Sequence, residues 1–442
     1  METTVAPPST SQSLYTPSQA VSGPMRKFNG RDVFALWFSL GLGLLAAQTG
    51  ALLVPGLSLP QALGVIVLGG VLGAALLALA GMIGADTGLA AMASLRATLG
   101  DHGALIPTLA NVAQLLGWGA FEVVVMGRSF DALAQHHLGF SCRPGWALAA
   151  GVCATLVAML GPLSFVRRFL RNWGIWLLLF AALWLSCNAL AHLDLHALLA
   201  RPAIGGLGFS RGIDIVVAIG LSWLPLISDY TRFGRRPASM FWGTFGGFGI
   251  ASLWFFMLGA IYAAAAGANA LIPALASVGG GLALLFILMS EIDNAFADIH
   301  SAAVSCALLL RWCNVRMLSG VFGALCIGLA LGTPIHHFEG FLILIGSIFA
   351  PLFGVVLSDH FLVRHRAPAS IAGQAPRWRF GALAAWAFGI VLYQTVYHLW
   401  PAVGASLPAL FASAGSNWII ARYTRAACTA VARPNTNPPL PG

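Results

Sequence analysis

Charged residues are scarce in this chain. Asp, Glu, Lys and Arg together make up 8% of its 442 residues, while 58% are hydrophobic. A soluble domain carries about 25% charged residues, so the sequence excludes a soluble globule with an ordinary polar surface. Apolar runs of about 20 residues, the length that crosses roughly 30 Å of hydrocarbon as a helix, recur from one end of the chain to the other. They predict an all-α polytopic membrane protein.

Motifs of other protein classes are missing too. The sequence lacks the alternating ten-residue segments of an outer-membrane barrel, a phosphate-binding loop, a dinucleotide glycine motif and a nucleophile elbow. ATP-driven transport and enzyme activity are therefore not indicated. The 7 cysteines form no metal-like cluster, and His336, His337 and Glu339, in an expected outer loop, match no strong ligand spacing. No metal, disulfide or cofactor is expected, apart from a coupling cation.

Twelve apolar spans can be counted, with a polar tail on either side. Residues 1–28 are rich in Ser, Thr and Pro, and they and residues 422–442 are expected to be disordered cytoplasmic tails. A single transmembrane domain is expected between them, over residues 29–421. Its predicted spans are 33–53, 61–83, 104–127, 145–161, 172–191, 212–228, 240–266, 279–310, 317–332, 338–362, 379–399 and 402–421.

The net charge of +9 would suggest a nucleic-acid partner in a soluble protein. With the N-terminus placed in the cytoplasm, however, all but four of the 23 Lys and Arg residues fall on the cytoplasmic side. The exceptions are Arg128, Arg143, Arg201 and Arg211. This bias is the positive-inside pattern. It predicts a multi-pass protein of the inner (plasma) membrane with both termini in the cytoplasm, and no nucleic-acid partner.

Two of the spans contain residues that interrupt a helix. Span one reads "FSLGLGLLAAQTGALLVPG" and span six reads "VVAIGLSWLPLISDYTRF". Where Gly or Pro breaks a helix, backbone N–H and C=O groups lose their helical partners. Such groups are tolerated at membrane depth only where they line a cavity. Two broken spans placed five apart favour a transporter with inverted five-helix repeats, here 33–191 and 212–362, followed by two further helices over 379–421. The alternative is that these Gly and Pro residues only permit close packing.

Ionisable residues inside spans three and eight are functional candidates, because each costs a few kcal/mol or more in hydrocarbon. In span three, Trp118 and Glu122 are one turn apart and share a face. In span eight, one helical stripe holds Glu291, Asn294, Asp298 and Ser301, and another holds Asp293 and His300. The two spans correspond in a five-plus-five repeat. By contrast, Asp229, Arg232 and Arg235 follow span six and are expected to form surface pairs.

The residue types in span three suit a flat heterocycle. A carboxyl or carboxamide offers a donor and an acceptor side by side, which matches the edge of an aminopyrimidine or cytosine. An indole such as that of Trp118 or Trp223 stacks on the face of the ring. The alternatives are that Trp118 is a packing or interface tryptophan and Glu122 a protonated structural acid. Without a cationic partner, Glu122 is expected to be neutral at rest and able to carry a coupling proton.

The segments "GWGAFE" in span three, "SDYTRFGR" after span six and "DNA" at 293–295 resemble the nucleobase:cation symporter-1 family. Within this family of cytosine and hydantoin permeases, the chain is most similar to the hydroxymethylpyrimidine permease branch, which is associated with thiamine precursor salvage. The resemblance covers roughly residues 29–421. It implies twelve helices, the first ten forming the inverted repeat that is also found in sodium-coupled amino-acid transporters.

The resemblance also implies roles for single residues. Trp118 would stack on the substrate ring, and Glu122 would hydrogen-bond to the polar edge of that ring. The family usually has Gln at this second position, and Glu in its place favours a ring that carries an amino group. The family's sodium site uses main-chain carbonyls of span one and two hydroxyls of span eight, but here Ser290 is followed by Glu291, so Na⁺ and H⁺ both remain open. The other substrate contacts expected are Trp223, Asp293, Asn294, Gln48 and Gly220, and the cation contacts are Ser290, Glu291, Gly43 and Ala46.

The sequence thus predicts a secondary symporter that imports a small planar pyrimidine with Na⁺ or H⁺. Hydroxymethylpyrimidine is the first candidate substrate and a cytosine-like base the second. An amino-acid or amine carrier of the same architecture is the alternative within transport. An intramembrane enzyme that uses Asp293, Asp298 and His300, or a channel, is the alternative from another class.

Overall fold

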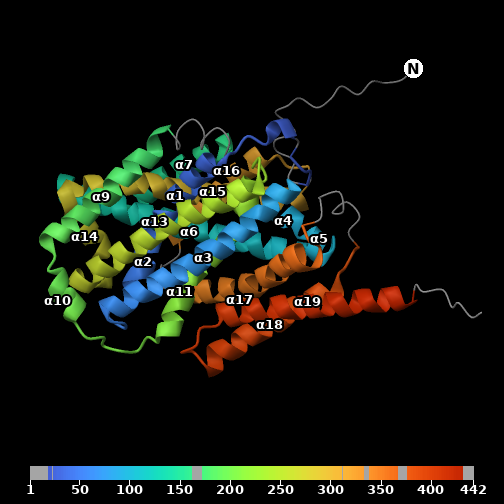
Figure 1. Cartoon of the computed structure of the whole chain (residues 1–442). Coiled ribbons are helices and arrows are strands. Elements are labelled where there is room, and N and C mark those ends of the chain that lie inside the picture. Colours follow the sequence, from blue (N-terminus) through green and yellow to red (C-terminus); the bar gives the residue numbers. More distant parts are fainter. Residues whose placement is uncertain are drawn as a thin grey trace, which may run out of the picture.

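The computed structural model describes residues 18–21, 23–161, 172–310, 312–332, 338–366 and 376–431. In these ranges the regular elements are all helical, and the one β-type contact is an isolated pairing of Phe28 with Gly234. The predicted all-α class is therefore confirmed. Figure 1 shows the helices gathered into one bundle, with α18 and α19 along one side of it. His336 and His337 lie outside the described residues.

Ten long helices build most of the bundle. They are α3 (Leu59–Thr87), α6 (Leu105–Leu138), α7 (Arg143–Leu160), α9 (Ile175–His192), α13 (Pro237–Ala266), α15 (Leu282–Leu309), α16 (Val315–Gly332), α17 (Phe338–Leu357), α18 (Phe380–Leu399) and α19 (Ser406–Val431). Short helices connect or extend them, namely α4 (Ala91–Ser94), α5 (Arg96–Leu99), α10 (Leu195–Ala200), α14 (Leu271–Ser277) and η7 (Ser358–Val363).

The helices of the described residues include 8 that are long and apolar enough to cross a membrane, or up to 10 if each of two bent pairs is one span. The first bent pair is α1 (Gly30–Gly41) with α2 (Leu44–Leu52), and the second is Ala268–Ser277, which includes α14, with α15. Predicted spans six and twelve are not among these, so the count of twelve stays a prediction. Repeated apolar crossings nevertheless agree with a polytopic membrane protein.

Span one is broken, as its glycines predict. Helix α1 (Gly30–Gly41) begins at a capping box in which the Asn29 side chain accepts from the amide of Asp32. It ends at Leu42, and α2 (Leu44–Leu52) continues after a bend of 53°. Span six is broken too, because α11 (Phe209–Ser222) stops four residues before α12 (Ile227–Thr231). Pro225 lies in that gap and has no N–H to continue a helix.

Helix α2 lies so close to α13 that no side chain fits at their crossing. A Cβ at Gly50 would stand 1.9 Å from the carbonyl oxygen of Phe256, and one at Gly259 would stand 1.9 Å from that of Ala47. Small residues at helix crossings bring backbones together and increase van der Waals contact in membrane proteins. The second half of the broken span is therefore fixed to α13, which leaves its N-terminal end facing α15.

The described end of the expected N-terminal tail packs against the helices. The Phe28 amide donates to the Phe233 carbonyl at 2.9 Å, and the Arg235 amide donates to the Phe28 carbonyl at 3.0 Å. Arg26 Nη1 donates to the carbonyl oxygen of Ala85 at the end of α3, at 2.7 Å. Residues just before α1 thus connect the ends of α3 and α12. At the other terminus, α19 continues to Val431, ten residues past the predicted end of span twelve.

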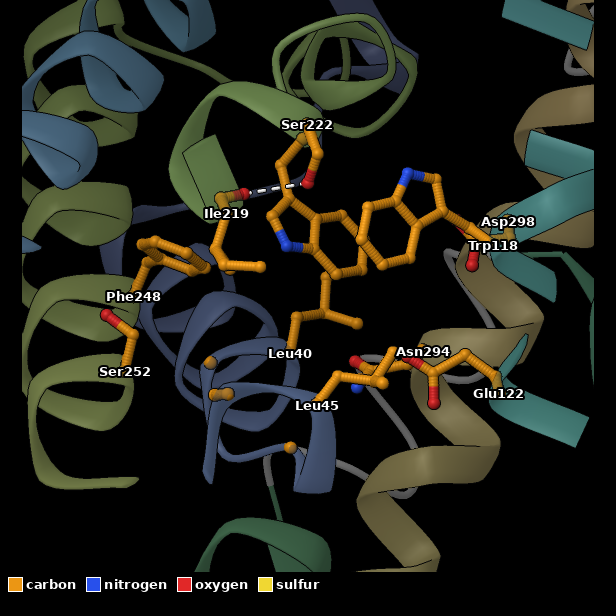
Figure 2. A pocket seen from close by; sticks show the side chains of 14 residues that line it. Leu40, Leu45, Trp118, Glu122, Ile219, Ser222, Phe248, Ser252, Asn294 and Asp298 are labelled. Carbon is orange, nitrogen blue, oxygen red and sulfur yellow. Dashed lines mark hydrogen bonds between the residues drawn. The ribbon is translucent and has the colours of Figure 1, made fainter. Parts of the chain in front are cut away.

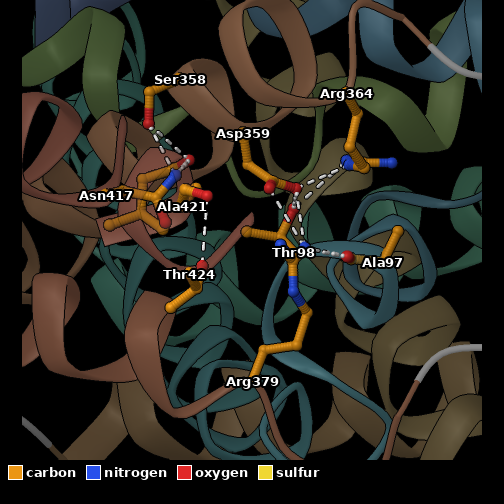
Figure 3. Close-up of polar contacts among 10 residues, drawn as sticks. Ala97, Thr98, Ser358, Asp359, Arg364, Arg379, Asn417, Ala421 and Thr424 are labelled. Carbon is orange, nitrogen blue, oxygen red and sulfur yellow. Dashed lines mark hydrogen bonds and ion pairs between the residues drawn. The ribbon is translucent and has the colours of Figure 1, made fainter. Parts of the chain in front are cut away.

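A buried carboxylate joins η7 to α5 and α18 (Figure 3). Asp359 is 0% exposed, and it accepts hydrogen bonds from Thr98 at 2.9 Å, Arg364 at 2.7 Å and Arg379 at 3.1 Å. Asn417 of α19 donates to the neighbouring Ser358 at 3.0 Å. A charge that is removed from water is tolerated when it is paired and hydrogen-bonded. This network therefore ties the C-terminal helices to the connector after α3.

A second carboxylate at the same end of the bundle binds the segment after η7. Asp86 accepts from Arg366 at 2.7 and 2.9 Å and lies 2.9 Å from Nε2 of His360. The hydrogen bond to Asp86 raises the pKa of Arg366, because it stabilises the charged guanidinium. Both carboxylates thus hold basic residues that the positive-inside pattern assigns to the cytoplasmic side.

Replacing Asp359 should destabilise the protein. Asp359→Asn leaves two guanidinium groups without their carboxylate, and we expect the free energy of unfolding to fall by about 2–3 kcal/mol, the range for a hydrogen bond to a charged group. The thermal midpoint of the purified protein in detergent measures this. Asp101→Asn is the control, since Asp101 is 51% exposed and 4.0 Å from Arg96. An equal midpoint shift in both variants would contradict the role of the Asp359 network.

Candidate functional site

A cavity opens where the broken helices α1–α2 and α11–α12 meet α6, α13 and α15. The space among its lining atoms amounts to about 480 Å³, which includes open solvent, and the volume available to the centre of a water-sized molecule is about 30 Å³. Figure 2 shows the side chains around it. Those that line it are Leu40, Gly41, Gly43, Leu45, Ala46, Trp118, Glu122, Ile219, Ser222, Trp223, Phe248, Ser252, Asn294 and Asp298. Both interrupted spans thus contribute to one cavity, as the requirement for satisfied backbone groups predicts.

Helix α6 brings an aromatic ring and a carboxyl group into the cavity together. Trp118 and Glu122 both line it, and Figure 2 shows Trp118 beside Asp298 and Glu122 beside Asn294. Their side chains are 7% and 3% exposed. The Trp118 ring also makes an edge contact with Phe341 of α17, with ring centroids 5.5 Å apart. Trp118 and Glu122 thus lie on the same face of α6, as predicted, and the contact with Phe341 restrains the indole of Trp118.

The break in span six contributes a second indole. Trp223 follows the last residue of α11 and lines the cavity together with Ile219 and Ser222. Its ring makes an edge contact with Trp37 of α1 at a centroid distance of 5.8 Å. Gly220 does not line the cavity, because it packs on α3, where an added Cβ would stand 2.9 Å from the Cα of Gly73. The aromatic surface from this span is thus that of Trp223.

Glu122 faces polar groups of α15 across the cavity. Its carboxyl group lines the cavity together with Asn294 and Asp298 of that helix. Oε2 of Glu122, Oε2 of Glu291 and Oδ1 of Asn294 have no hydrogen-bond partner. Buried polar atoms without partners are uncommon in folded proteins, and at a cavity they are available to a ligand.

Glu291 is hydrogen-bonded to the main chain at the break in span one. It is 0% exposed, and its Oε1 accepts a hydrogen bond from the main-chain amide of Leu44, the first residue of α2. An added Cβ at Gly43 would stand 2.8 Å from Nδ2 of Asn294 and 3.4 Å from Oε1 of Glu291. Glycine is therefore required at this position by the close approach of α15, not by its backbone angles.

The neighbours of Glu291 in α15 hold the end of α1. Oγ of Ser290 lies 2.6 Å from the carbonyl oxygens of both Ser39 and Leu42. The hydroxyl of Ser39 in turn donates to Oδ2 of Asp293. Asp293 is thus directed at α1, while the adjacent Asn294 lines the cavity. The two residues that the sequence analysis groups as substrate contacts have different surroundings.

The expected span-one contacts divide in a similar way. Gly43 and Ala46 line the cavity, whereas the carbonyl groups beside Ser290 are those of Ser39 and Leu42. Gln48 is half-buried in α2 and does not belong to the cavity lining. Sequence reasoning also missed Phe248 and Ser252 of α13. That helix is apolar on all sides, so no periodicity marks the face that meets the cavity.

The residues after span six are not at the surface as expected. Asp229 and Arg232 are 1% and 3% exposed. Oδ1 of Asp229 accepts from the amide of Ala91 in α4 at 2.9 Å, and the guanidinium of Arg232 lies over the ring of Phe233 at 4.8 Å. The expectation of surface pairs is therefore wrong for these two residues. The short α12 places them between α3, α4 and α15, which cover them.

Comparisons with known proteins identify relatives along the whole chain. A family model for the permease for cytosine/purines, uracil, thiamine and allantoin matches residues 24–405. Cytosine permease of Escherichia coli (strain K12) is 26% identical over 429 residues, which cover 92% of this chain and 96% of that protein. Hydantoin permease of Microbacterium maritypicum is 24% identical over 391 residues, which cover 80% and 77%.

Solved structures show the same fold. The transporter Mhp1 of the nucleobase-cation-symport-1 family, in a closed conformation with bromovinylhydantoin bound, has a TM-score of 0.81 at 20% identity and covers 94% of this chain and 96% of that one. A Na⁺-coupled sialic acid symporter has a TM-score of 0.63 at 12% identity, with 94% of each chain covered. The predicted inverted-repeat transporter fold is thus confirmed, and the relatives are permeases, not enzymes. Matched over most of its length, the chain belongs to the nucleobase:cation symporter-1 family.

Proposed function

We propose that this protein is a secondary symporter of the inner membrane that imports a small planar pyrimidine with Na⁺ or H⁺. One observation carries the proposal, namely that carboxyl and amide oxygens of Glu122 and Asn294 without hydrogen-bond partners line a cavity that two indoles also line. Few ligands offer both a ring face to stack and a polar edge to hydrogen-bond. A nitrogen heterocycle does, and permeases named for cytosine and hydantoin are among the relatives.

The polar groups in the cavity favour a ring that carries an amino group. Glu122 and Asp298 both line it, and a carboxylate only accepts hydrogen bonds. An exocyclic amino group donates to one oxygen of such a carboxyl, and the ring nitrogen beside it accepts from a protonated carboxyl or from an amide. Hydroxymethylpyrimidine and cytosine both have this edge. The ring would lie against the indole of Trp118 or that of Trp223, which both line the cavity.

The same groups argue against an amino-acid substrate. A carrier of that kind would hold the substrate carboxylate on amides exposed at the helix breaks. Here the Leu44 amide already donates to Glu291, and the acids that line the cavity would repel a second carboxylate. An amine remains chemically compatible with these acids. Competition experiments therefore need amines as well as amino acids.

The transport cycle follows from the broken helices. In the proposed cycle the transmembrane domain spans residues 29–421, with both termini in the cytoplasm, and the α1–α2 and α11–α12 pairs move against the other helices around the cavity. A ligand shifts such an equilibrium only by its difference in affinity between the two states. Substrate held between α6 and α15 would favour the closed state.

Uptake by vesicles that contain the purified protein tests the proposal. Labelled hydroxymethylpyrimidine and cytosine are offered separately, and unlabelled aminopyrimidines, amines and amino acids compete. We expect saturable uptake that aminopyrimidines abolish and that amino acids leave unchanged. Inhibition by amino acids or simple amines alone would favour the alternative carrier, and product formation in detergent would favour an enzyme.

Glu122→Ala should abolish pyrimidine uptake, because it removes the carboxyl group that would pair with the ring edge. Initial uptake rates in vesicles, normalised to the amount of folded protein, measure the loss. Asp101→Ala is the control, because that exposed carboxylate lies in the connector before α6. Normal uptake by Glu122→Ala would remove this residue from the site.

Trp118→Ala should weaken pyrimidine binding by about 1–2 kcal/mol, the range for a lost base–aromatic stack. This corresponds to a Kd increased roughly 5-fold to 30-fold, measured by titration of the purified protein. Trp242→Ala is the matched control, since its side chain is 66% exposed on the outside of α13. Equal affinities in the two variants would mean that the indole of Trp118 is a packing group only.

A further inference from the structure

Asp298 is the acid of α15 that lines the cavity, and it is only 3% exposed. Among the described residues, no hydrogen-bond or ion-pair partner lies at its carboxyl group, and Figure 2 marks none. The two acids that precede it in this helix, Glu291 and Asp293, are hydrogen-bonded to the broken span one. A buried carboxyl group without a partner is costly. A ligand in the cavity would supply the partner that Asp298 lacks.

Asp298 lies at the same level of the cavity wall as Trp118. Figure 2 shows these two residues side by side, and it shows Glu122 beside Asn294. An added Cβ at Gly119, the residue after Trp118 in α6, would stand 3.7 Å from the Cβ of Asp298, so the two helices are in contact there. Trp118 and Glu122 are one turn apart in α6. Asn294 and Asp298 are one turn apart in α15. The polar wall of the cavity therefore has two levels, separated by about 6 Å along the helix axes.

The protein itself offers no cation to this carboxyl group. The described residues that line the cavity include no Lys, Arg or His. A carboxylate accepts hydrogen bonds and donates none. The partner that Asp298 requires is therefore a hydrogen-bond donor on the ligand. On a pyrimidine whose face rests on the neighbouring indole, an exocyclic amino group presents two N–H donors at the edge of the ring.

We infer that Asp298 is the residue that selects substrates by their exocyclic amino group. The inference rests on the proposed function, and it assigns the amino group to one of the two acids that line the cavity. A ring stacked on Trp118 would bring its edge to Asp298, and the amino group would donate to the carboxyl group there. Glu122 and Asn294, one turn away, would then meet the remaining polar atoms of the ring.

This assignment predicts which rings the carrier rejects. A ring with an oxo group in place of the amino group would turn a carbonyl oxygen toward the carboxylate, and two acceptors cannot pair. A ring with hydrogen in that place would leave the carboxyl group buried without a partner. Sites built to hydrogen-bond a substrate discriminate strongly against the analogue that lacks the bonding group. Cytosine and hydroxymethylpyrimidine, which carry the amino group, should therefore bind in preference to uracil.

A cycle that removes the amino group from the ligand and the carboxyl group from the protein tests the inference. Cytosine and hydroxymethylpyrimidine are each compared with the analogue that has hydrogen in place of the amino group, by titration of the purified full-length protein. For the natural protein we expect loss of the amino group to raise Kd roughly 10-fold to 100-fold, the factor for a hydrogen bond to a charged group. For Asp298→Ala we expect the two Kd values to agree within about twofold, the usual error of additivity.

A second variant keeps the shape of the side chain. Asp298→Asn retains an acceptor oxygen and gains an N–H donor, so the preference for cytosine over uracil should shrink in this variant, because uracil binds better and cytosine worse. Asp101→Ala is the control and should keep the full effect of the amino group. If Asp298→Ala does not fold, the change in the ratio of the cytosine and uracil Kd values in Asp298→Asn decides the question.

The outcomes distinguish this inference from the proposed function. An undiminished amino-group effect in Asp298→Ala, or an unchanged cytosine preference in Asp298→Asn, would overturn the inference and leave pyrimidine transport standing. Loss of the amino-group effect in Glu122→Gln instead would assign the selection to that residue and overturn the inference as well. If neither pyrimidine binds to the natural protein or enters vesicles that contain it, the proposed function fails, and the role of Asp298 fails with it.

Discussion

The hydrogen bond from the Leu44 amide to the Glu291 carboxyl is the contact on which the rest of the site depends. Breaking a helix inside a membrane leaves amides and carbonyl groups that lipid cannot satisfy. Helix α15 supplies the hydrogen-bond partners at the break in span one. The Ser290 hydroxyl lies at the carbonyl groups of Ser39 and Leu42, and Glu291 accepts from the Leu44 amide. The interruption is thus stable only because α15 lies against it.

This arrangement explains why the acids of α15 are found in the interior. Asp293 is bonded to the Ser39 hydroxyl, and Glu291 to Leu44, so both acids bind the two ends of the broken helix. Asn294 and Asp298 are left to line the cavity. A helix with this many carboxyl groups would be costly against lipid. Here Glu291 and Asp293 are hydrogen-bonded to the broken span, and these contacts offset the cost of their burial and also shape the cavity.

The sequence predicted the features that follow from composition and local pattern. Glycine and proline marked both breaks, and the spacing of Trp118 and Glu122 placed them on one face. What it could not predict depends on which element covers a residue. Asp229 and Arg232 follow a span and read as surface charges, yet α4 and α15 cover them. Nor does any spacing rule show that Ser39 and Leu42, instead of Gly43 and Ala46, present their carbonyl groups to Ser290.

The position of Glu291 has a consequence for how substrate and ion are linked. In a carrier whose two sites are separate, coupling has to pass through intervening side chains that switch between two arrangements. Here Glu291 accepts a hydrogen bond from the Leu44 amide at the break in span one, and Asn294, about one turn further along α15, lines the cavity. A movement of α15 therefore affects both the break in span one and the cavity lining. The break in span one and the cavity are thus joined through a single turn of α15.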